Sequence, residues 1–289
     1  MPQQGNPSRH PLSILGPSVT VIILNITGFL LIVLVVFVGF VWLFQERIAF
    51  QPPPAHLPES VEANRVSYQA RDGQPLLAYV VGDPKASRGM LLSFHGNADL
   101  AVHAIGWAKE VNRVTGFAVM LTEYRGYMNL GGRPTYTGSQ LDSEAAYKFA
   151  RTQLGVPADR IAYYGHSLGS AIAAELASRH RPLALLLESP FTSARAMSRI
   201  IGWRAVHVVW NAIARFHFDT VERVASIEAP VWVVHGTRDR IIPAQMGREV
   251  FAAAKTKGEL LLVPDASHND VTLAGGPEYW RWMSAALAK

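Results

Sequence analysis

A serine between two glycines lies where an apolar run gives way to an alanine-rich run. The stretch is "IAYYGHSLGSAIAAELA", residues 161–177, and it contains the pattern G-x-S-x-G around Ser167. Glycines two residues either side let a strand and a helix approach closely, so that a sharp turn lifts the serine above the sheet. The start of a helix also favours negative charge. The pattern therefore predicts a nucleophilic serine.

A serine hydroxyl is a weak nucleophile until a base takes its proton, and that base should be a histidine held by a carboxylate. In a sheet with this turn the chain order is serine, acid, histidine. His268 lies in the loop "PDASHND", after the last apolar run. His207 and His217 belong to an inserted segment, and His235 ends a strand, where a structural role is favoured. We therefore predict His268 as the base.

Two carboxylates are candidates for orienting this histidine. Asp239 in "HGTRDRIIP" follows the penultimate apolar run, and Glu188 ends the run before it in "LLLESP". We predict Asp239 as the acid and keep Glu188 as the second choice. Asp265 and Asp270 flank His268 too closely in sequence to orient it, although Asp270 could support the loop.

A tetrahedral oxyanion needs backbone N–H donors. The amide of Leu168, next after the nucleophile, is one candidate, and the amide of Asn97 in "LLSFHGNAD" is the other. His95 is expected to brace this loop rather than to transfer protons. Together these residues predict acyl transfer through an acyl-enzyme, with no metal and no organic cofactor.

Alternating strands and helices must position these residues. Short apolar runs predict strands at 89–96, 117–126, 160–166, 183–190, 230–236 and 259–264, and helical spacing predicts helices at 99–115, 139–154, 168–180, 244–256 and 277–288. Apolar strands separated by helices favour a mainly parallel sheet covered on both faces, an α/β fold. Two strands around the Asp72–Gly73 turn, within 65–81, are expected to form an antiparallel edge.

One segment interrupts this alternation. Residues 191–218 are rich in apolar residues and arginine, and they contain no acidic residue and no strand pattern. We expect one or two helices that form a small cap over the carboxyl edge of the sheet. This cap is either a packed helix with a solvated basic face or a lid that meets lipid headgroups and admits acyl chains.

The amino-terminal part has a different composition. Residues 19–44 carry no charge, and as a helix they would span roughly 39 Å, more than the ~30 Å hydrocarbon core. The run is too long for a signal peptide and no cleavage pattern follows it, so we predict a retained transmembrane helix. Residues 1–18 are expected to be a disordered tail and 45–64 a proline-rich linker, which leaves 65–289 for the α/β domain.

Basic residues on the two sides of the span nearly balance, with Arg9 before it and Arg47 after it. We expect the amino terminus inside and the main domain on the extracytoplasmic side of the membrane.

The chain of 289 residues has no cysteine, which excludes disulfides, a cysteine nucleophile and thiolate metal sites. Its net charge is +5, but the basic residues are scattered along the chain and form no run, so nucleic acid is not an expected partner.

The stretches "FHGNA", "EYRGY", "GHSLGSA", "ESPFTS", "FDTVERV", "PVWVVHGTRDRIIP" and "ASHND" occur in this order. With them, residues 45–289 resemble the α/β-hydrolase superfamily, most of all its membrane-associated branch of palmitoyl-protein thioesterases and uncharacterised bacterial hydrolases. The resemblance implies the α/β-hydrolase fold and the triad already chosen. It also implies that Tyr124 and Arg125 of "EYRGY" order a loop.

We therefore predict a membrane-anchored serine hydrolase of the esterase or thioesterase type. Its expected partners are the lipid bilayer and an acyl ester or thioester, with a lipid-like acyl group as a hypothesis. An aminopeptidase-like enzyme is one alternative, but it would need a carboxylate near the site to hold the substrate ammonium, and 191–218 supplies none. A non-catalytic anchored binding protein is the other, and an intact triad argues against it.

Overall fold

The computed structural model describes residues 17–55, 63–201 and 204–288 of the chain. Contacts between residues divide the chain into two units, residues 1–44 and residues 45–289. The predicted disordered tail lies almost wholly outside the described residues, and so do residues 56–62 of the predicted linker.

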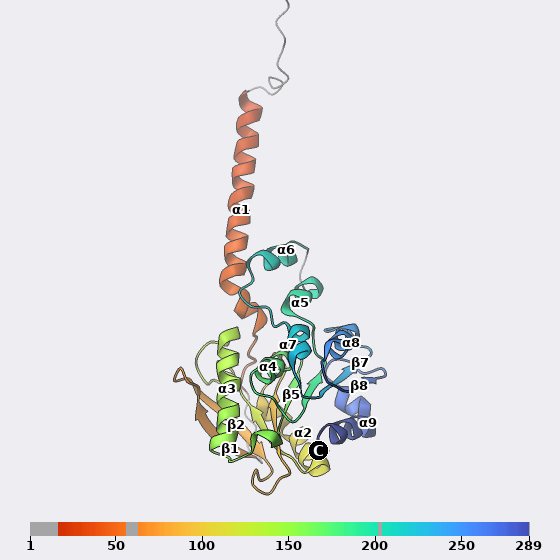
Figure 1. Cartoon of the computed structure of the whole chain (residues 1–289). Helices are drawn as coiled ribbons and strands as arrows, with labels where there is room; N and C mark the ends of the chain where they lie inside the picture. Colours follow the sequence, from red (N-terminus) through yellow and green to blue (C-terminus); the bar gives the residue numbers. More distant parts are fainter. Residues whose placement is uncertain (1–16, 56–62, 202–203, 289) are drawn as a thin grey trace, which may run out of the picture. The chain divides into compact units, whose positions relative to one another are not determined.

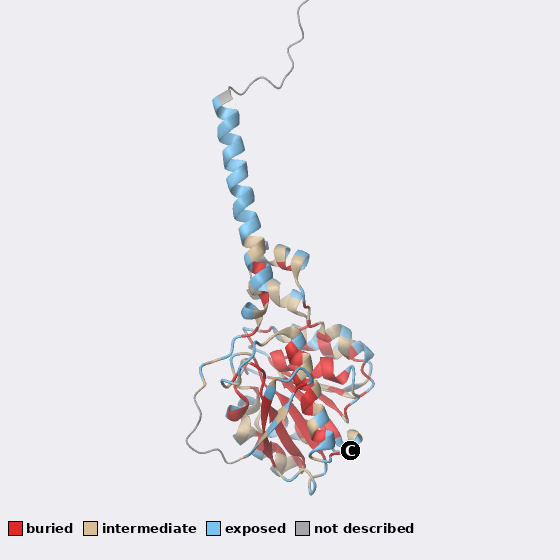
Figure 2. Cartoon of the chain, turned by 90° about the vertical axis from the view of Figure 1, so that its left-hand side faces the viewer, coloured by how far each residue is buried: buried red, intermediate tan, exposed pale blue. Residues whose placement is uncertain are grey.

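One helix, α1 (Pro17–Ala49), contains the predicted span and continues past it into the larger unit. Among the described helices, only α1 is long and apolar enough to cross a membrane, although a signal sequence near the amino terminus has the same properties. Residues 18–36 are exposed along this helix (Figure 2). Lipid could cover an apolar surface of this length.

The larger unit is built on one sheet of eight strands in the order β1-β2-β4-β3-β5-β6-β7-β8. The strands are β1 (Asn64–Gln69), β2 (Pro75–Val81), β3 (Met90–Phe94), β4 (Ala118–Thr122), β5 (Ile161–His166), β6 (Leu185–Glu188), β7 (Val231–Gly236) and β8 (Lys257–Val263). β2 pairs antiparallel with β1 and with β4, and all other neighbours are parallel. The predicted mainly parallel sheet with an antiparallel amino-terminal edge is confirmed.

Helices cover both faces of this sheet (Figure 1). One face carries α2 (Ile105–Thr115), which follows the 3-10 turn η1 (Ala101–Ala104), and α9 (Val271–Ala286). The other carries α3 (Tyr136–Thr152), α4 (Leu168–Ala177), α7 (Thr220–Ser226) and α8 (Ala244–Ala253), with the 3-10 turn η2 (Ala158–Arg160) before β5. Strands β3 to β7 are therefore buried almost throughout (Figure 2), which explains their continuous apolar sequences.

Two helices begin earlier than predicted. α3 starts at Tyr136 rather than near residue 139, because the side chain of Thr135 caps it and accepts a hydrogen bond from the Gly138 amide at 2.9 Å. α9 starts at Val271 rather than at residue 277, and a kink at Gly276, with φ of 45°, separates its two helical parts. The sequence pattern identified only the second part of α9.

The predicted cap contains two helices between β6 and β7, α5 (Ala194–Ile201) and α6 (Arg204–Ile213). The imidazole of His207 on α6 joins them. Its Nε2 accepts a hydrogen bond from Nε of Arg199 at 2.9 Å, and its Nδ1 lies 2.8 Å from Oγ of Ser198. Described residues of the cap form no strand, as expected.

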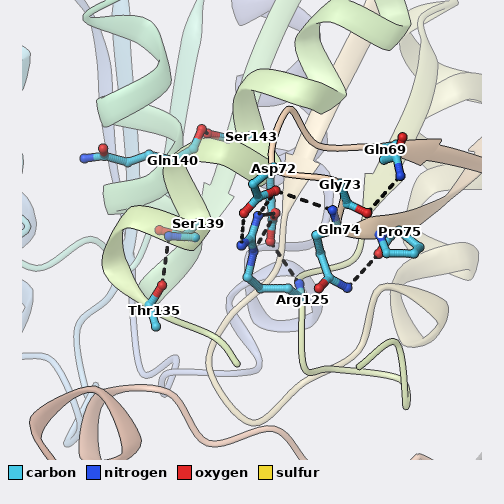
Figure 3. Close-up of polar contacts among 12 residues, drawn as sticks. Gln69, Asp72, Gly73, Gln74, Pro75, Arg125, Thr135, Ser139, Gln140 and Ser143 are labelled. Carbon is cyan, nitrogen blue, oxygen red and sulfur yellow. Dashed lines mark hydrogen bonds and ion pairs between the residues drawn. The ribbon is translucent and has the colours of Figure 1, made fainter. Parts of the chain in front are cut away.

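Arg125 joins the β1–β2 turn to α3 (Figure 3). Its Nε and Nη2 donate to Oδ1 of Asp142 at 2.9 and 2.7 Å, and its Nη1 donates to Oδ2 of Asp72 at 2.6 Å. Nearby, the hydroxyl of Tyr124 donates to the carbonyl oxygen of His95 at 2.8 Å. These contacts hold the chain after β4 in place, which fits the ordering role implied for "EYRGY".

Candidate active site

Ser167 lies in the turn between β5 and α4 with a strained backbone, at φ of 52° and ψ of −116°. A non-glycine residue in such a conformation costs of order 1–3 kcal/mol, and strain of this kind is typical of functional sites. A Cβ atom added to Gly165 would clash with the backbone of Gly169, and one added to Gly169 would clash with the backbone of Phe94. The two glycines of G-x-S-x-G are therefore needed for the turn that raises Ser167 at the carboxyl end of the sheet.

The predicted residues Ser167, Asp239 and His268 meet at the carboxyl edge of the sheet. Each lies in a loop that follows a different parallel strand. Nε2 of His268 lies 2.9 Å from Oγ of Ser167, and Nδ1 of His268 lies 2.6 Å from Oδ2 of Asp239. The loops follow β5, β7 and β8, and both Asp239 and His268 are buried. In this geometry the imidazole can take the serine proton while the carboxylate holds the ring.

The carboxylate of Asp239 is surrounded by hydrogen-bond donors. Its Oδ1 accepts the backbone amides of Ile241 and Ile242, each at 2.8 Å. Burial alone would raise the pKa of Asp239. Hydrogen bonds to the side chains of His235 and His268 and to the Ile242 amide outweigh burial and hold the pKa of this carboxyl well below its usual range. Asp239 is therefore ionised at neutral pH.

His235, which the sequence placed in a structural role, lies against the candidate acid. Its ring is fully buried, and its Nε2 lies 3.2 Å from Oδ2 of Asp239 and 2.9 Å from the carbonyl oxygen of Ile242. Because both partners are acceptors, Nε2 carries a proton. The spacing in "HGTRD" is a signal for this contact, but only the turn after β7 shows that the two side chains face each other.

The second-choice acid contacts other residues. Oε2 of Glu188 accepts the hydroxyls of Tyr164 at 2.8 Å and Tyr279 at 2.9 Å, and the Glu188 carbonyl oxygen accepts the amide of Ser167 at 2.9 Å. Glu188 therefore supports the turn at Ser167, whereas Asp239 contacts the imidazole of His268.

The two acids beside His268 also differ in position. Oδ1 of Asp270 accepts the amide of Ser267 at 2.6 Å, so this side chain supports the histidine loop as expected. Asp265 forms an exposed ion pair with Arg238 at 2.8 Å. Among the described residues, no group of three or more histidine, aspartate or glutamate side chains is placed to hold a metal ion.

The loop after β3 brings Asn97 to the cavity that Ser167 and Leu168 also line. Leu168 is the first residue of α4, so its N–H has no acceptor within the helix. Gly96 allows the close approach of this loop, because a Cβ atom there would lie 2.9 Å from Nδ1 of His166. The structure thus brings both predicted oxyanion residues to the cavity that Ser167 lines.

A buried ion pair between His95 and Glu123 fixes the loop after β3 that carries Asn97. Nε2 of His95 lies 2.8 Å from Oε1 of Glu123, and its Nδ1 lies 2.8 Å from the carbonyl oxygen of Gly96. Burial would lower the pKa of His95, but the charge and hydrogen bond of Glu123 reverse this effect and the pKa is raised. His95 therefore braces the loop, as predicted.

An apolar cavity of about 360 Å³ opens beside Ser167. The aromatic and aliphatic side chains that line it include Phe191, Met197, Trp210, Phe216, Phe218 and Ile242, from the cap and the loops around it. A predominantly apolar lining of this kind suits an acyl chain. A second cavity of about 440 Å³, between β1 and α3, is lined by none of the predicted site residues.

Comparisons with known proteins agree with this architecture. No protein-family model matches the chain. An uncharacterised protein of Mycobacterium tuberculosis is 34% identical over 254 residues, which cover 83% of this chain and 85% of that protein. Human alpha/beta hydrolase domain-containing protein 17B is 31% identical over 202 residues, which cover 68% of this chain and 66% of that protein. The chain belongs to the α/β-hydrolase superfamily.

Solved structures of α/β-hydrolase fold resemble this chain over most of its length. An esterase of Pyrococcus furiosus superimposes with a TM-score of 0.63, covering 82% of this chain and 98% of that chain at 20% identity. An acetyl xylan esterase from a Paenibacillus species superimposes with a TM-score of 0.61 at 20% identity. The match covers 82% of this chain and 90% of that chain. At such identities the likeness concerns the fold.

Proposed function

We propose that this α/β-hydrolase is a membrane-anchored serine hydrolase that cleaves carboxylic ester or thioester bonds of acyl substrates. The observation that carries the proposal is the run of contacts from Ser167 through His268 to Asp239, beside an apolar cavity. Other proteins of this fold perform many reactions, so the function is argued from these residues and not from the fold.

The proposed reaction has two halves. Oγ of Ser167 attacks the acyl carbonyl carbon while His268 takes its proton, and His268 then returns the proton to the leaving oxygen or sulfur. Asp239 orients the ring and stabilises the imidazolium. The amides of Leu168 and Asn97 bind the oxyanion. His268 then takes a proton from water, whose oxygen attacks the acyl-enzyme carbonyl. As the bond to Oγ breaks, His268 returns this proton to Ser167 and the carboxylic acid is released.

The cavity lining supports an acyl substrate over a peptide amine. An aminopeptidase-like enzyme needs a carboxylate to hold the substrate ammonium, and the described residues that line the cavity include no aspartate or glutamate. A lipid-like acyl group fits the aromatic lining, and it fits the resemblance to the thioesterase branch. The names of two structural neighbours, which are called esterases, also favour ester chemistry.

The proposed anchor is α1. Its apolar part is long enough to cross a bilayer. The last turn of the same helix, from Gln45, belongs to the larger unit. A retained helix therefore fits better than a cleaved signal sequence, and we keep the extracytoplasmic side as the proposed location of the larger unit.

The proposal is tested by hydrolysis of p-nitrophenyl esters of increasing chain length by the full-length protein in detergent. Wild type should turn over medium and long esters faster than acetyl ester, and Ser167→Ala should lower kcat by roughly 10³-fold or more. Absence of ester turnover by folded wild type, with no turnover of an acyl thioester in a parallel assay, would favour the binding-protein alternative. Equal turnover of acetyl and long esters would contradict the hypothesis that the substrate carries a lipid-like acyl group.

A further inference from the structure

The side chain of Asn97 joins the candidate oxyanion loop to the chain that follows the apolar run. Its Nδ2 donates to the carbonyl oxygen of Ala49 at 2.8 Å, and its Oδ1 accepts the backbone amide of Gln51 at 2.9 Å. Oδ1 also accepts the hydroxyl of Tyr127 at 2.8 Å. We call these three hydrogen bonds the Asn97 clamp. The first two bonds hold the main chain on both sides of residue 50, and the third holds the Asn97 side chain itself.

The residues from 45 to 51, the juxtamembrane segment, are themselves fixed to the larger unit. Oε1 of Gln45 accepts the amide of Arg215 at 2.8 Å, at the end of the cap. Oε1 of Glu46 accepts the amide of Tyr136 at 3.2 Å, at the first residue of α3, where a carboxylate is favoured. Phe50 is only 2% exposed. The segment is therefore packed structure and not a loose tether.

The same segment forms one wall of the cavity beside the serine. Ile48, Ala49 and Gln51 line it together with Ser167 and Asn97. Phe50 packs its ring edge-on against Phe218, another residue of the lining, with ring centroids 6.1 Å apart. The juxtamembrane segment thus contacts both the acyl cavity and the oxyanion loop.

We propose that the juxtamembrane segment is a working part of the active site, which positions the Asn97 amide through the Asn97 clamp and closes one side of the acyl cavity. The inference rests on the proposed function, because it assigns the Asn97 amide to the oxyanion. Asn97 then has two roles. Its backbone N–H binds the oxyanion, and its side chain positions that N–H. Ala49 and Gln51 are positioning residues that act through their main chain.

Substitution by proline at residue 51 tests the clamp, because Gln51→Pro removes the one N–H that donates to Asn97. Ala55→Pro is the matched control, since it adds a proline to the same stretch, and Ala55 neither lines the cavity nor contributes to the clamp. The full-length variants are assayed in detergent with p-nitrophenyl butyrate as the substrate. Loss of a whole oxyanion donor costs about 10²–10³ in kcat, so a displaced donor should cost about tenfold or more.

Because an oxyanion donor acts in the transition state, Gln51→Pro should lower kcat while KM stays within about threefold of wild type. Ala55→Pro should stay close to wild type in both constants. Equal kcat values for the two variants would overturn the inference and leave the serine hydrolase proposal standing, because wild type would still turn over ester. Wild type without turnover would overturn both.

A second pair of variants, Asn97→Ala and Tyr127→Phe, keeps the test decisive if thermal unfolding shows that Gln51→Pro does not fold. Asn97→Ala retains the backbone amide but removes both bonds to the juxtamembrane segment. Tyr127→Phe removes only the third bond of the clamp. We expect a fall in kcat of about tenfold or more for Asn97→Ala, with little change in KM, and a smaller fall for Tyr127→Phe. A kcat for Asn97→Ala equal to that of wild type would overturn the inference.

Discussion

Two histidines lie against one carboxylate oxygen in this α/β-hydrolase. Oδ2 of Asp239 is 2.6 Å from Nδ1 of His268 and 3.2 Å from Nε2 of His235. The imidazole of His235 is fully buried, and its Nε2 contacts the acid and the carbonyl oxygen of Ile242, so we expect it to take no part in proton transfer. It stabilises the ionised acid instead.

Replacement of this second histidine should lower stability in a pH-dependent way. A buried hydrogen bond to a charged group contributes about 1.5–3 kcal/mol, so His235→Phe should lower the free energy of unfolding by about 2 kcal/mol at pH 7. His235→Gln keeps an N–H donor and should recover much of this loss. Urea unfolding measured between pH 7 and pH 2 checks both variants.

The sign of the pH effect follows from the depressed pKa of Asp239. A carboxyl whose folded pKa is below its unfolded value of about 3.9 stabilises the fold above that value, and this contribution is lost as pH falls through the folded pKa. The gap between wild type and His235→Phe should therefore narrow below about pH 4. A gap that stays constant with pH would show that His235 contributes packing alone.

The acid assignment predicts unequal effects of two isosteric changes. Asp239→Asn presents an amide to His268, disfavours the required tautomer, and should lower kcat by roughly 10⁴-fold. Glu188→Gln still offers an oxygen to the hydroxyls of Tyr164 and Tyr279, so its kcat should stay within about tenfold of wild type. Steady-state kinetics on p-nitrophenyl butyrate measures both. Equal losses would mean that Asp239 is not the orienting acid.

The cavity beside the serine should set acyl-chain preference. Ala194 lines it at the start of α5, so Ala194→Trp should fill part of its volume. Each methylene that no longer fits costs about 1–3 kcal/mol, so kcat/KM for long esters should fall at least about tenfold while acetyl ester changes little. Ile200→Trp, at an exposed position on the same helix outside the lining, is the control. A uniform loss for all chain lengths would argue against an acyl role for this cavity.

The Arg125 network should contribute strongly to stability. Arg125→Met leaves Asp142, whose side chain is 3% exposed, as a buried charge without its partner, which should cost about 3–5 kcal/mol in the free energy of unfolding. Asp72→Asn alters the partner that is 37% exposed and should cost about 1 kcal/mol or less. Denaturant unfolding distinguishes the two, and similar small losses would show that the network is only a surface feature.

The pattern of strands and helices could be predicted because parallel strands buried on both faces are continuous apolar runs, as β3 to β7 are. The order of the sheet could not be predicted in the same way. β4 lies between β2 and β3, and that order depends on pairing between segments far apart in the chain. The early start of α3 had a local signal in Thr135, which a search for caps would find.

The sequence pointed to single candidates for the site where a residue type has one suitable position. Ser167 has its two glycines, and His268 lies after the last strand. Glu188 remained a second choice beside Asp239, because one ends β6 and the other follows β7, the neighbouring parallel strand. The structure places Asp239, and not Glu188, against the His268 ring. The bonds of Asn97 to Ala49 and Gln51 span more than forty residues and leave no local pattern in the sequence.

The central claim is that Ser167 is a nucleophile activated by His268, and covalent labelling tests it most directly. Purified wild type, Ser167→Ala and Ser170→Ala are treated with a fluorophosphonate probe, and the modified peptide is identified by mass spectrometry. We predict one adduct on Ser167 in wild type and in Ser170→Ala, and none in Ser167→Ala. Labelling that persists in Ser167→Ala, or folded wild type that takes up no probe, would contradict the account.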